Sequence, residues 1–138
     1  MKERTIEFAV GAAGYSGIEI AVRGHTHWTM TILGGLCLIL LCWIARSQAG
    51  RPLLVQAALG AAGITAAEFC VGVVVNLALG WNVWDYYKEA GNLLGQICPK
   101  FSFYWFLLCI GVFGVLRGAG PLLKSARDLL EKRRVPRL

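Results

Sequence analysis

Four apolar stretches, separated by short polar segments, run along this chain of 138 residues. They cover approximately residues 5–22, 28–45, 53–79 and 101–117. A helix of about 20 apolar residues crosses the ~30 Å hydrocarbon core of a bilayer. The pattern therefore predicts an all-α integral membrane protein, a four-helix bundle made by one domain that spans the whole chain.

Basic residues are distributed unevenly between the two ends of this bundle. Four spans place both termini on one side, together with the turn that holds Arg46 and Arg51, and this side collects 11 of the 14 lysines and arginines. The positive-inside rule then makes both termini cytoplasmic. The net charge of +6 is explained by this topology and by anionic lipid headgroups, so a nucleic-acid partner is not expected.

The segment between the third and fourth stretches, residues 80–100, lies on the outer side in this topology. Its tryptophans and tyrosines are typical of an interfacial aromatic belt. Asp85, Asn92 and Gln96, however, alternate with glycines and apolar residues. This alternation favours a re-entrant outer loop, which the bilayer allows only where protein or water covers the backbone.

The C-terminal segment differs from the four spans in its pattern. Gly118, Gly120 and Pro121 predict a break in the helix. In residues 121–138, leucines recur every three or four positions opposite lysines and arginines. We therefore expect a basic amphipathic helix on the inner membrane surface, or docked on a cytoplasmic partner.

Small residues recur on one face of the first and third stretches, a spacing that lets helices approach closely in lipid. They are Gly11, Gly14 and Gly17, then Ala58, Ala62 and Ala66. We expect the first and third helices to be the closely packed pair, within one subunit or across a dimer interface.

Glu68 is the single formal charge of the third stretch and lies near its middle. A carboxylate at that depth costs about 2.5 kcal/mol or more, so it usually faces protein, water or an ion. Gly72 and Asn76 follow it at four-residue spacing and extend a polar stripe towards the outer loop. Glu68 is either a functional group or a structural carboxylate, protonated or paired with Tyr15 or Ser16.

Further polar residues lie between the first two stretches. Glu19 and Arg23 share a helix face, as a structural salt bridge or with Arg23 turned towards an anionic substrate group. His25 and His27 are candidate metal ligands if Asp85 or Glu19 completes the site, although interfacial hydrogen bonding also explains them.

The five cysteines include no Cys-x-x-Cys pair, which argues against a disulfide framework or a zinc site. No ATP-binding loop and no hydrolase signature occurs in the sequence. We therefore expect no cofactor and no catalytic residues.

Three stretches carry a resemblance to a known family. They are Tyr15–Met30, with its Glu-Ile-Ala-Val-Arg-Gly-His-Thr-His-Trp run; Glu68–Asn76 leading into Trp81–Tyr86; and Asn92–Cys98 followed by Phe101 and Ser102. Together they resemble the small bacterial membrane proteins of the ABC-transporter type IV, or CmpB-like, family. The resemblance implies a permease role in the bacterial cytoplasmic (inner) membrane. It also implies substrate- or ion-binding positions at Glu68, Asn76, Glu19, Arg23, Asp85, Asn92 and Gln96.

The hypothesis for function is small-solute transport by a permease-like subunit or a small oligomeric carrier with a buried carboxylate. Four spans are few for a transport path, which favours a homo-oligomer or other membrane subunits as partners, besides lipid. The alternatives are a non-transporting accessory or regulatory protein and, ranked last, a membrane enzyme that uses His25, His27 and Asp85.

Overall fold

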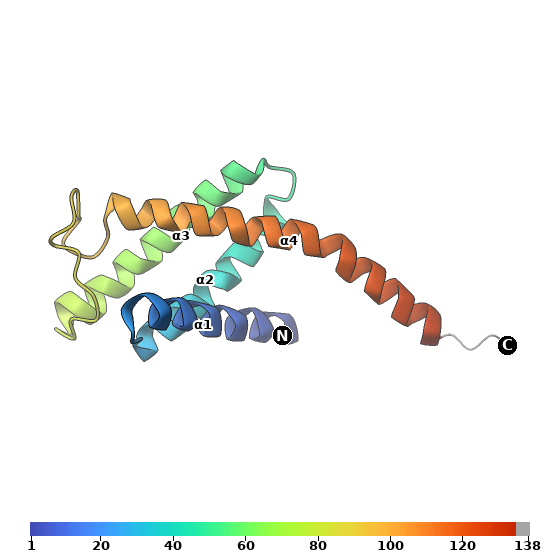
Figure 1. Cartoon of the computed structure of the whole chain (residues 1–138), viewed down its shortest axis with the longest axis horizontal. Helices are drawn as coiled ribbons and strands as arrows, with labels where there is room; N and C mark the ends of the chain where they lie inside the picture. The colour runs from blue at the N-terminus through green and yellow to red at the C-terminus, as the bar shows by residue number, and fades with distance from the viewer. Residues whose placement is uncertain (135–138) are drawn as a thin grey trace.

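The computed structural model of the chain describes residues 1–134 as helices joined by two short connections and one long one (Figure 1). The helices are α1 (Lys2–Arg23), α2 (Trp28–Ser47), α3 (Leu53–Gly72), its π-helical continuation η1 (Val73–Ala78), and α4 (Pro99–Arg134). In the described range an isolated bridge between Leu93 and Ile97 is the only β pairing. The predicted all-α fold is confirmed.

Three helical segments are long and apolar enough to cross a bilayer: Trp28–Ser47, Leu53–Ala78 and Pro99–Leu122. The chain is therefore a membrane protein with at least this many candidate spans. α1 is not among them, because Glu7 and Glu19 interrupt its apolar run.

Consecutive helices run in alternating directions, so the connections gather at two ends (Figure 1). At one end lie residues 24–27 and the long segment 79–98; at the other lie the N-terminus and the α2–α3 turn. Gly24 adopts φ 77° and ends α1 there, a left-handed conformation that suits glycine. The buried core lies between α2, α3 and α4 around Leu41, Ile64 and Phe113.

The predicted pairing of the first and third helices is wrong. α1 packs along α2, and α3 packs along α4. Gly34 and Gly35 of α2 form another small-residue surface, and Gly11 packs against it. A Cβ added to Gly11 would lie 2.5 Å from the Gly34 carbonyl oxygen. The alanine face of α3 made by Ala58, Ala62 and Ala66 is exposed instead.

The predicted break after the fourth span is also absent. α4 continues through Pro121 to Arg134, and it bends in its second half (Figure 1). Proline removes one backbone hydrogen bond, and a helix can accommodate that loss by bending rather than ending. The amphipathic segment is thus a continuation of α4; residues 135–138 of it lie outside the described residues.

Candidate functional site

The segment 79–98 folds back onto the end of α3 at Gly72. A Cβ added to Gly72 would lie 2.5 Å from Oε1 of Gln96 and 2.8 Å from Cζ2 of Trp84. Both of these side chains are buried. Gly72 is therefore the contact point at which helix and loop meet, and the absence of a side chain there permits the approach.

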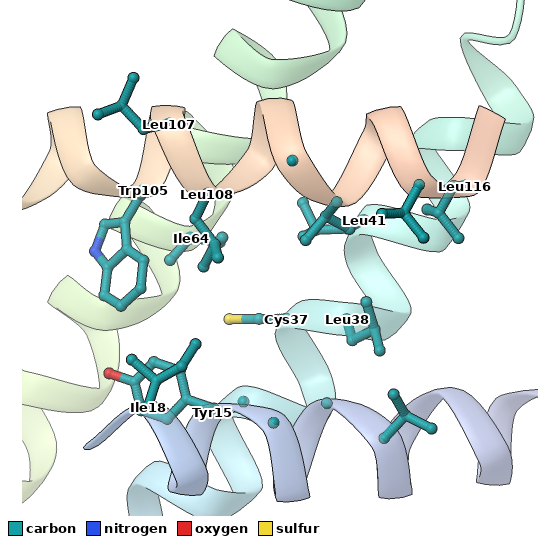
Figure 2. A pocket seen from close by; sticks show the side chains of 17 residues that line it. Tyr15, Ile18, Cys37, Leu38, Leu41, Ile64, Trp105, Leu107, Leu108 and Leu116 are labelled. Carbon is teal, nitrogen blue, oxygen red and sulfur yellow. The ribbon is translucent and has the colours of Figure 1, made fainter. Parts of the chain in front are cut away.

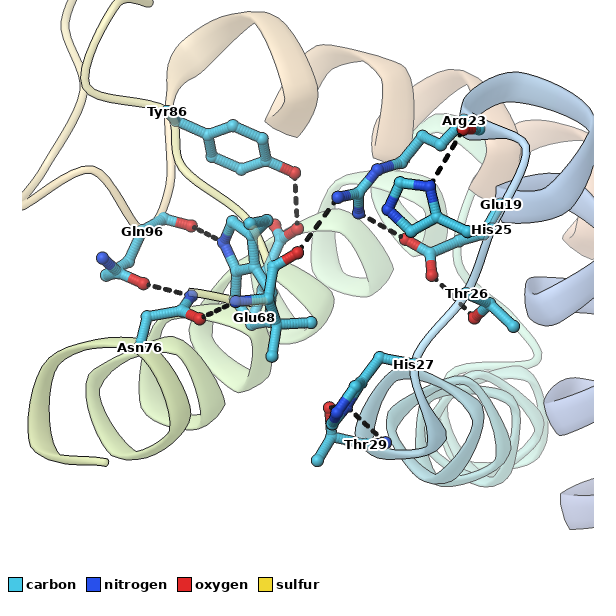
Figure 3. Close-up of polar contacts among 12 residues, drawn as sticks. Glu19, Arg23, His25, Thr26, His27, Thr29, Glu68, Asn76, Tyr86 and Gln96 are labelled. Carbon is cyan, nitrogen blue, oxygen red and sulfur yellow. Dashed lines mark hydrogen bonds and ion pairs between the residues drawn. The ribbon is translucent and has the colours of Figure 1, made fainter. Parts of the chain in front are cut away.

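Asn76 and Gln96 fasten this loop with a closed hydrogen-bond network (Figure 3). Asn76 Nδ2 donates to Gln96 Oε1 at 2.8 Å, and the backbone N–H of Val83 donates to Asn76 Oδ1 at 2.6 Å. The indole of Trp84 donates to the Gln96 carbonyl at 2.9 Å. The side chain of Gln96, 2% exposed, also donates to the Leu94 carbonyl. These two amides serve the loop itself.

Asn92 has a comparable role within the loop. Its Nδ2 donates to the carbonyls of Tyr87 and Glu89, and its Oδ1 accepts from the Gly95 N–H at 3.0 Å. All polar atoms of this side chain are thus used by backbone groups of the turn. The structure places Asn92 beside the loop backbone, away from the cavity described below.

Glu68 lies at the meeting point of α3, the loop and α4. The Tyr86 hydroxyl donates to its Oε1 at 3.2 Å, and the Trp105 indole N–H donates to its Oε2 at 3.0 Å. Glu68 is 1% exposed, so both oxygens are satisfied inside the protein. The predicted partners were wrong: Ser16 shares a hydrogen bond with Thr31 of α2, and the Tyr15 ring packs on the Trp105 ring.

Tyr86 is held in place by its ring and by its hydroxyl group. It stacks on Phe101 with a centroid separation of 4.5 Å and an interplanar angle of 11°. Burial, together with the neighbouring Glu68 carboxylate, raises the pKa of the Tyr86 hydroxyl. The hydroxyl therefore keeps its proton and acts as a donor to Glu68 (Figure 3).

Glu19 and Arg23 form the ion pair predicted from their spacing, with 3.0 Å between Arg23 Nη1 and Glu19 Oε1. Arg23 Nη2 also donates to the Val83 carbonyl, and Thr26 Oγ1 donates to Glu19 Oε2 at 2.8 Å (Figure 3). Glu19 is 6% exposed. The pair thus ties the end of α1 to both connections at this end of the molecule.

The two histidines have separate local partners. His27 is the N-cap of α2: its Nδ1 accepts from the Thr29 N–H and bonds Thr29 Oγ1 at 2.7 Å. His25 Nδ1 lies 3.1 Å from the Arg23 carbonyl oxygen. Within residues 1–134, no three His, Cys, Asp or Glu side chains come together in a group that could hold a metal ion.

A cavity of about 600 Å³ opens between the end of α1, the loop and the start of α4. We call it the outer cavity. Four charged residues and six aromatic residues line it: Glu19, Arg23, Asp85 and Glu89, with Tyr15, Trp84, Tyr86, Phe101, Tyr104 and Trp105. The Tyr86 and Trp105 side chains that line this cavity also bind Glu68, which lies behind them.

A second hollow of about 640 Å³ adjoins the outer cavity and lies between α1 and α4 (Figure 2). We call it the apolar groove. Tyr15, Ile18, Trp105 and Leu108 line both hollows, so the two are neighbours that share these side chains as a common wall. Cys37, Leu38 and Leu41 of α2 contribute to its wall (Figure 2).

Apart from Glu68, which lies behind the cavity wall, the site positions predicted from the sequence divide into two groups. Glu19, Arg23 and Asp85 line the outer cavity, whereas Asn76, Asn92 and Gln96 hold the loop. The aromatic residues Tyr86 and Trp105 were assigned no role at Glu68. The sequence did contain a signal for these contacts. A carboxylate in the middle of a span needs hydrogen-bond donors, and tyrosine and tryptophan supply them from otherwise apolar side chains.

Comparison with known proteins agrees with this architecture. A family model described as "Putative ABC-transporter type IV" matches residues 15–134. No curated protein and no solved structure matches the chain. The matched range covers most of the sequence and includes the outer cavity, Glu68 and the whole of α4. The chain belongs to the ABC-transporter type IV family and is a membrane protein.

Proposed function

We propose that this protein is a membrane subunit of a transport system and binds a small solute in the outer cavity. It acts as a permease-like subunit or as a small oligomeric carrier. The family description supports a role in transport. The single observation that carries the proposal is that the two side chains forming the inner wall of the cavity, Tyr86 and Trp105, are the two hydrogen-bond donors to the buried Glu68.

This arrangement links the cavity to Glu68 chemically. A carboxylate accepts hydrogen bonds at both oxygens, whereas a protonated carboxyl group presents one O–H donor. Binding of a proton or cation at Glu68 therefore weakens the hydrogen bond that Glu68 accepts from Tyr86 or Trp105. The more weakly held ring can then shift against the solute that occupies the cavity. Glu68 is the proton- or cation-responsive group in this mechanism.

The remaining polar residues have supporting roles. The Glu19–Arg23 pair joins α1 to the Val83 carbonyl and so keeps one wall of the cavity closed. Asn76 and Gln96 hold the loop that carries Asp85 and Tyr86. We assign the chain no enzymatic activity of its own, and ATP hydrolysis, where the system uses it, belongs to another subunit.

The same proposal includes a topology in the bacterial cytoplasmic membrane. α1 is the fourth span, with its charges neutralised in pairs: Glu19 binds Arg23, and Glu7 binds Arg46 of α2 at 2.6 Å. The end that carries Arg46, Arg51 and the N-terminus faces the cytoplasm, as the positive-inside rule favours. The segment 79–98 is then outside. Four spans are few for a transport path, which favours assembly with a second copy or another subunit.

A second candidate function is that of a non-transporting accessory protein for a membrane partner. The observation that favours it is the complete packing of Glu68, which is 1% exposed and satisfied at both oxygens. In that case Glu68 only joins α3, the loop and α4. For the membrane enzyme no comparable observation exists, since His27 caps α2 and His25 binds backbone.

Proton movement into vesicles distinguishes the two candidates. Purified protein is reconstituted into liposomes that contain a pH-sensitive dye, a pH gradient is imposed, and tetraethylammonium, glycine or glutamate is added in turn. Transport predicts that at least one of these solutes speeds decay of the gradient, and that Glu68→Gln abolishes the effect while Glu3→Gln, at an exposed position in α1, does not. A gradient that no solute affects contradicts the proposal and supports the accessory role, whereas full activity of Glu68→Gln removes Glu68 from the mechanism.

A further inference from the structure

The outer cavity and the apolar groove adjoin each other, with the packed Tyr15 and Trp105 rings as a common wall, and their linings differ chemically. All the charged side chains line the outer half, the outer cavity, whereas the inner half, the apolar groove, is lined mostly by aliphatic side chains and glycines, with Tyr15, Cys37 and Trp105 (Figure 2). A ligand that fills both halves must be amphiphilic, with a polar head and an apolar chain. Such a ligand also matches the surroundings, because a membrane-embedded groove exchanges its occupants with lipid.

The charges of the outer half favour a positive head. Its lining includes three carboxylates, Glu19, Asp85 and Glu89, and one guanidinium, Arg23. Arg23 is already bound to Glu19 and to a backbone carbonyl, and Glu89 is bound by Lys100 at 3.2 Å. Among the side chains that the structure describes, Asp85 has no ion pair. An anionic head would add charge beside these carboxylates, and a cationic head would complete the pairing.

The aromatic lining favours the same charge. Tyr86 and Phe101 are stacked, and the Tyr104 ring meets Phe101 edge to face with 5.7 Å between centroids. Aromatic faces attract organic cations within about 6 Å, which is the basis for binding of quaternary ammonium groups in aromatic cages. Asp85 and these aromatic side chains thus line the same cavity at the outer end of α4.

The inner half has room for an alkyl chain. From Trp105 to Leu116 the groove follows α4 for about 16 Å at 1.5 Å per residue. Gly14 and Gly111 lie on its walls, and a Cβ added to either would meet no atom within 4 Å. The rim residues Val10, Ile18 and Leu107 are exposed, so a chain can enter sideways from the bilayer.

We propose that these two adjoining hollows together bind an amphiphilic organic cation, with its ammonium group among Asp85 and the aromatic rings and its alkyl chain between α1 and α4. The inference rests on the proposed transport function in one respect: it names the substrate class of the same outer cavity. Binding itself requires no transport and can be measured separately.

Titration calorimetry on the protein in lipid nanodiscs tests the proposal, with empty nanodiscs as the baseline. The probes are decyltrimethylammonium, decyl sulfate, decyl maltoside and tetramethylammonium, each below its micelle concentration. We expect decyltrimethylammonium to bind about tenfold or more tightly than the other three, since only it offers both the cation and the chain. Equal binding of decyl sulfate or decyl maltoside would overturn the choice of a cation.

Two pairs of variants locate the site. Asp85→Asn keeps the oxygen that accepts from the Tyr87 N–H, and should weaken decyltrimethylammonium binding by about tenfold, whereas Asp128→Asn, at an exposed position of α4, should not. Gly14→Leu should fill the groove and reduce binding, whereas Gly17→Leu, on α1 outside the groove lining, should not. Unchanged binding in Asp85→Asn or in Gly14→Leu refutes the proposed site. A change of oligomeric state in Gly14→Leu that Gly17→Leu does not show also refutes it.

These outcomes separate the inference from the proposed function. If decyltrimethylammonium does not bind while glycine or glutamate still speeds proton movement, the substrate class is wrong and transport stands. If the cation binds at this site while no solute moves protons, the binding site stands and transport is wrong.

Discussion

The indole N–H of Trp105 donates a 3.0 Å hydrogen bond to Glu68 and thereby joins α4 to α3 in the apolar interior. Trp105→Phe keeps an aromatic side chain, although a smaller one, and removes the donor, which leaves Glu68 Oε2 buried without a partner. We expect a loss of about 1–3 kcal/mol in the free energy of unfolding, which is the usual cost of such an unsatisfied group. Thermal unfolding in detergent, followed by circular dichroism, measures it.

A double-mutant cycle checks the cause of that loss. Glu68→Leu combined with Trp105→Phe removes both partners, so the pair should cost less than the sum of the two single changes. Additive effects would show that Trp105 stabilises the helix pair by packing alone.

Gly72 provides a prediction about the loop. Gly72→Ala places a methyl group 2.5 Å from Gln96 Oε1 and 2.8 Å from the Trp84 ring, so the loop must shift. We expect faster proteolysis within residues 79–98 and a lower melting temperature, with a cost of about 1–3 kcal/mol. Gly118→Ala, which meets no atom within 4 Å, is the matched control and should be neutral or slightly stabilising. Identical proteolysis of Gly72→Ala and the unmodified protein would contradict the packing described here.

The contact between α1 and α2 yields a third prediction. A Cβ at Gly34 would lie 2.3 Å from Cβ of Tyr15 and 2.9 Å from the Gly11 carbonyl oxygen. Gly34→Ala must therefore push the two helices apart and lower the melting temperature. Gly14→Ala, on the same α1 surface but with no atom within 4 Å, should have little effect. Equal melting temperatures for the two variants would argue against this helix pairing.

The sequence predicted contacts within one helix correctly, but it did not predict which helices pack together. The Glu19–Arg23 pair and the stripe from Glu68 to Asn76 follow from helix geometry, since residues four apart share a face. Local periodicity does not reveal which helix will meet that face. Gly11 was correctly predicted to lie at a close helix contact, but its partner is α2 and not α3. Both helices have small residues on one face, and only tertiary packing decides between them.

The same limit applies to the site. Asn76 and Gln96 were identified as polar residues near the loop, but their hydrogen bonds to one another depend on how residues 79–98 fold back. Pro121 predicted a helix end by local rules, yet α4 continues because a bend is sufficient. The pairing of Trp105 with Glu68 links positions far apart in the sequence, and it could be anticipated only by asking which donors reach a buried carboxylate.

The proposed topology can be tested by chemical labelling. In a Cys70→Ala background the four remaining cysteines are buried. Lys88→Cys, in the loop, should react with a membrane-impermeant maleimide added to intact cells, whereas Ala49→Cys, in the α2–α3 turn, should react only after the cells are opened. The reverse pattern would invert the orientation, and labelling of both sites in intact cells would refute the assignment of the two ends to opposite sides.

The central claim is that the outer cavity and Glu68 are linked through Tyr86 and Trp105. Infrared difference spectroscopy of the reconstituted protein tests it directly, using the carboxyl band that disappears in Glu68→Gln. Addition of whichever solute speeds proton movement, among tetraethylammonium, glycine and glutamate, should shift this band in the unmodified protein. A band that stays unchanged while that solute is bound would contradict the link.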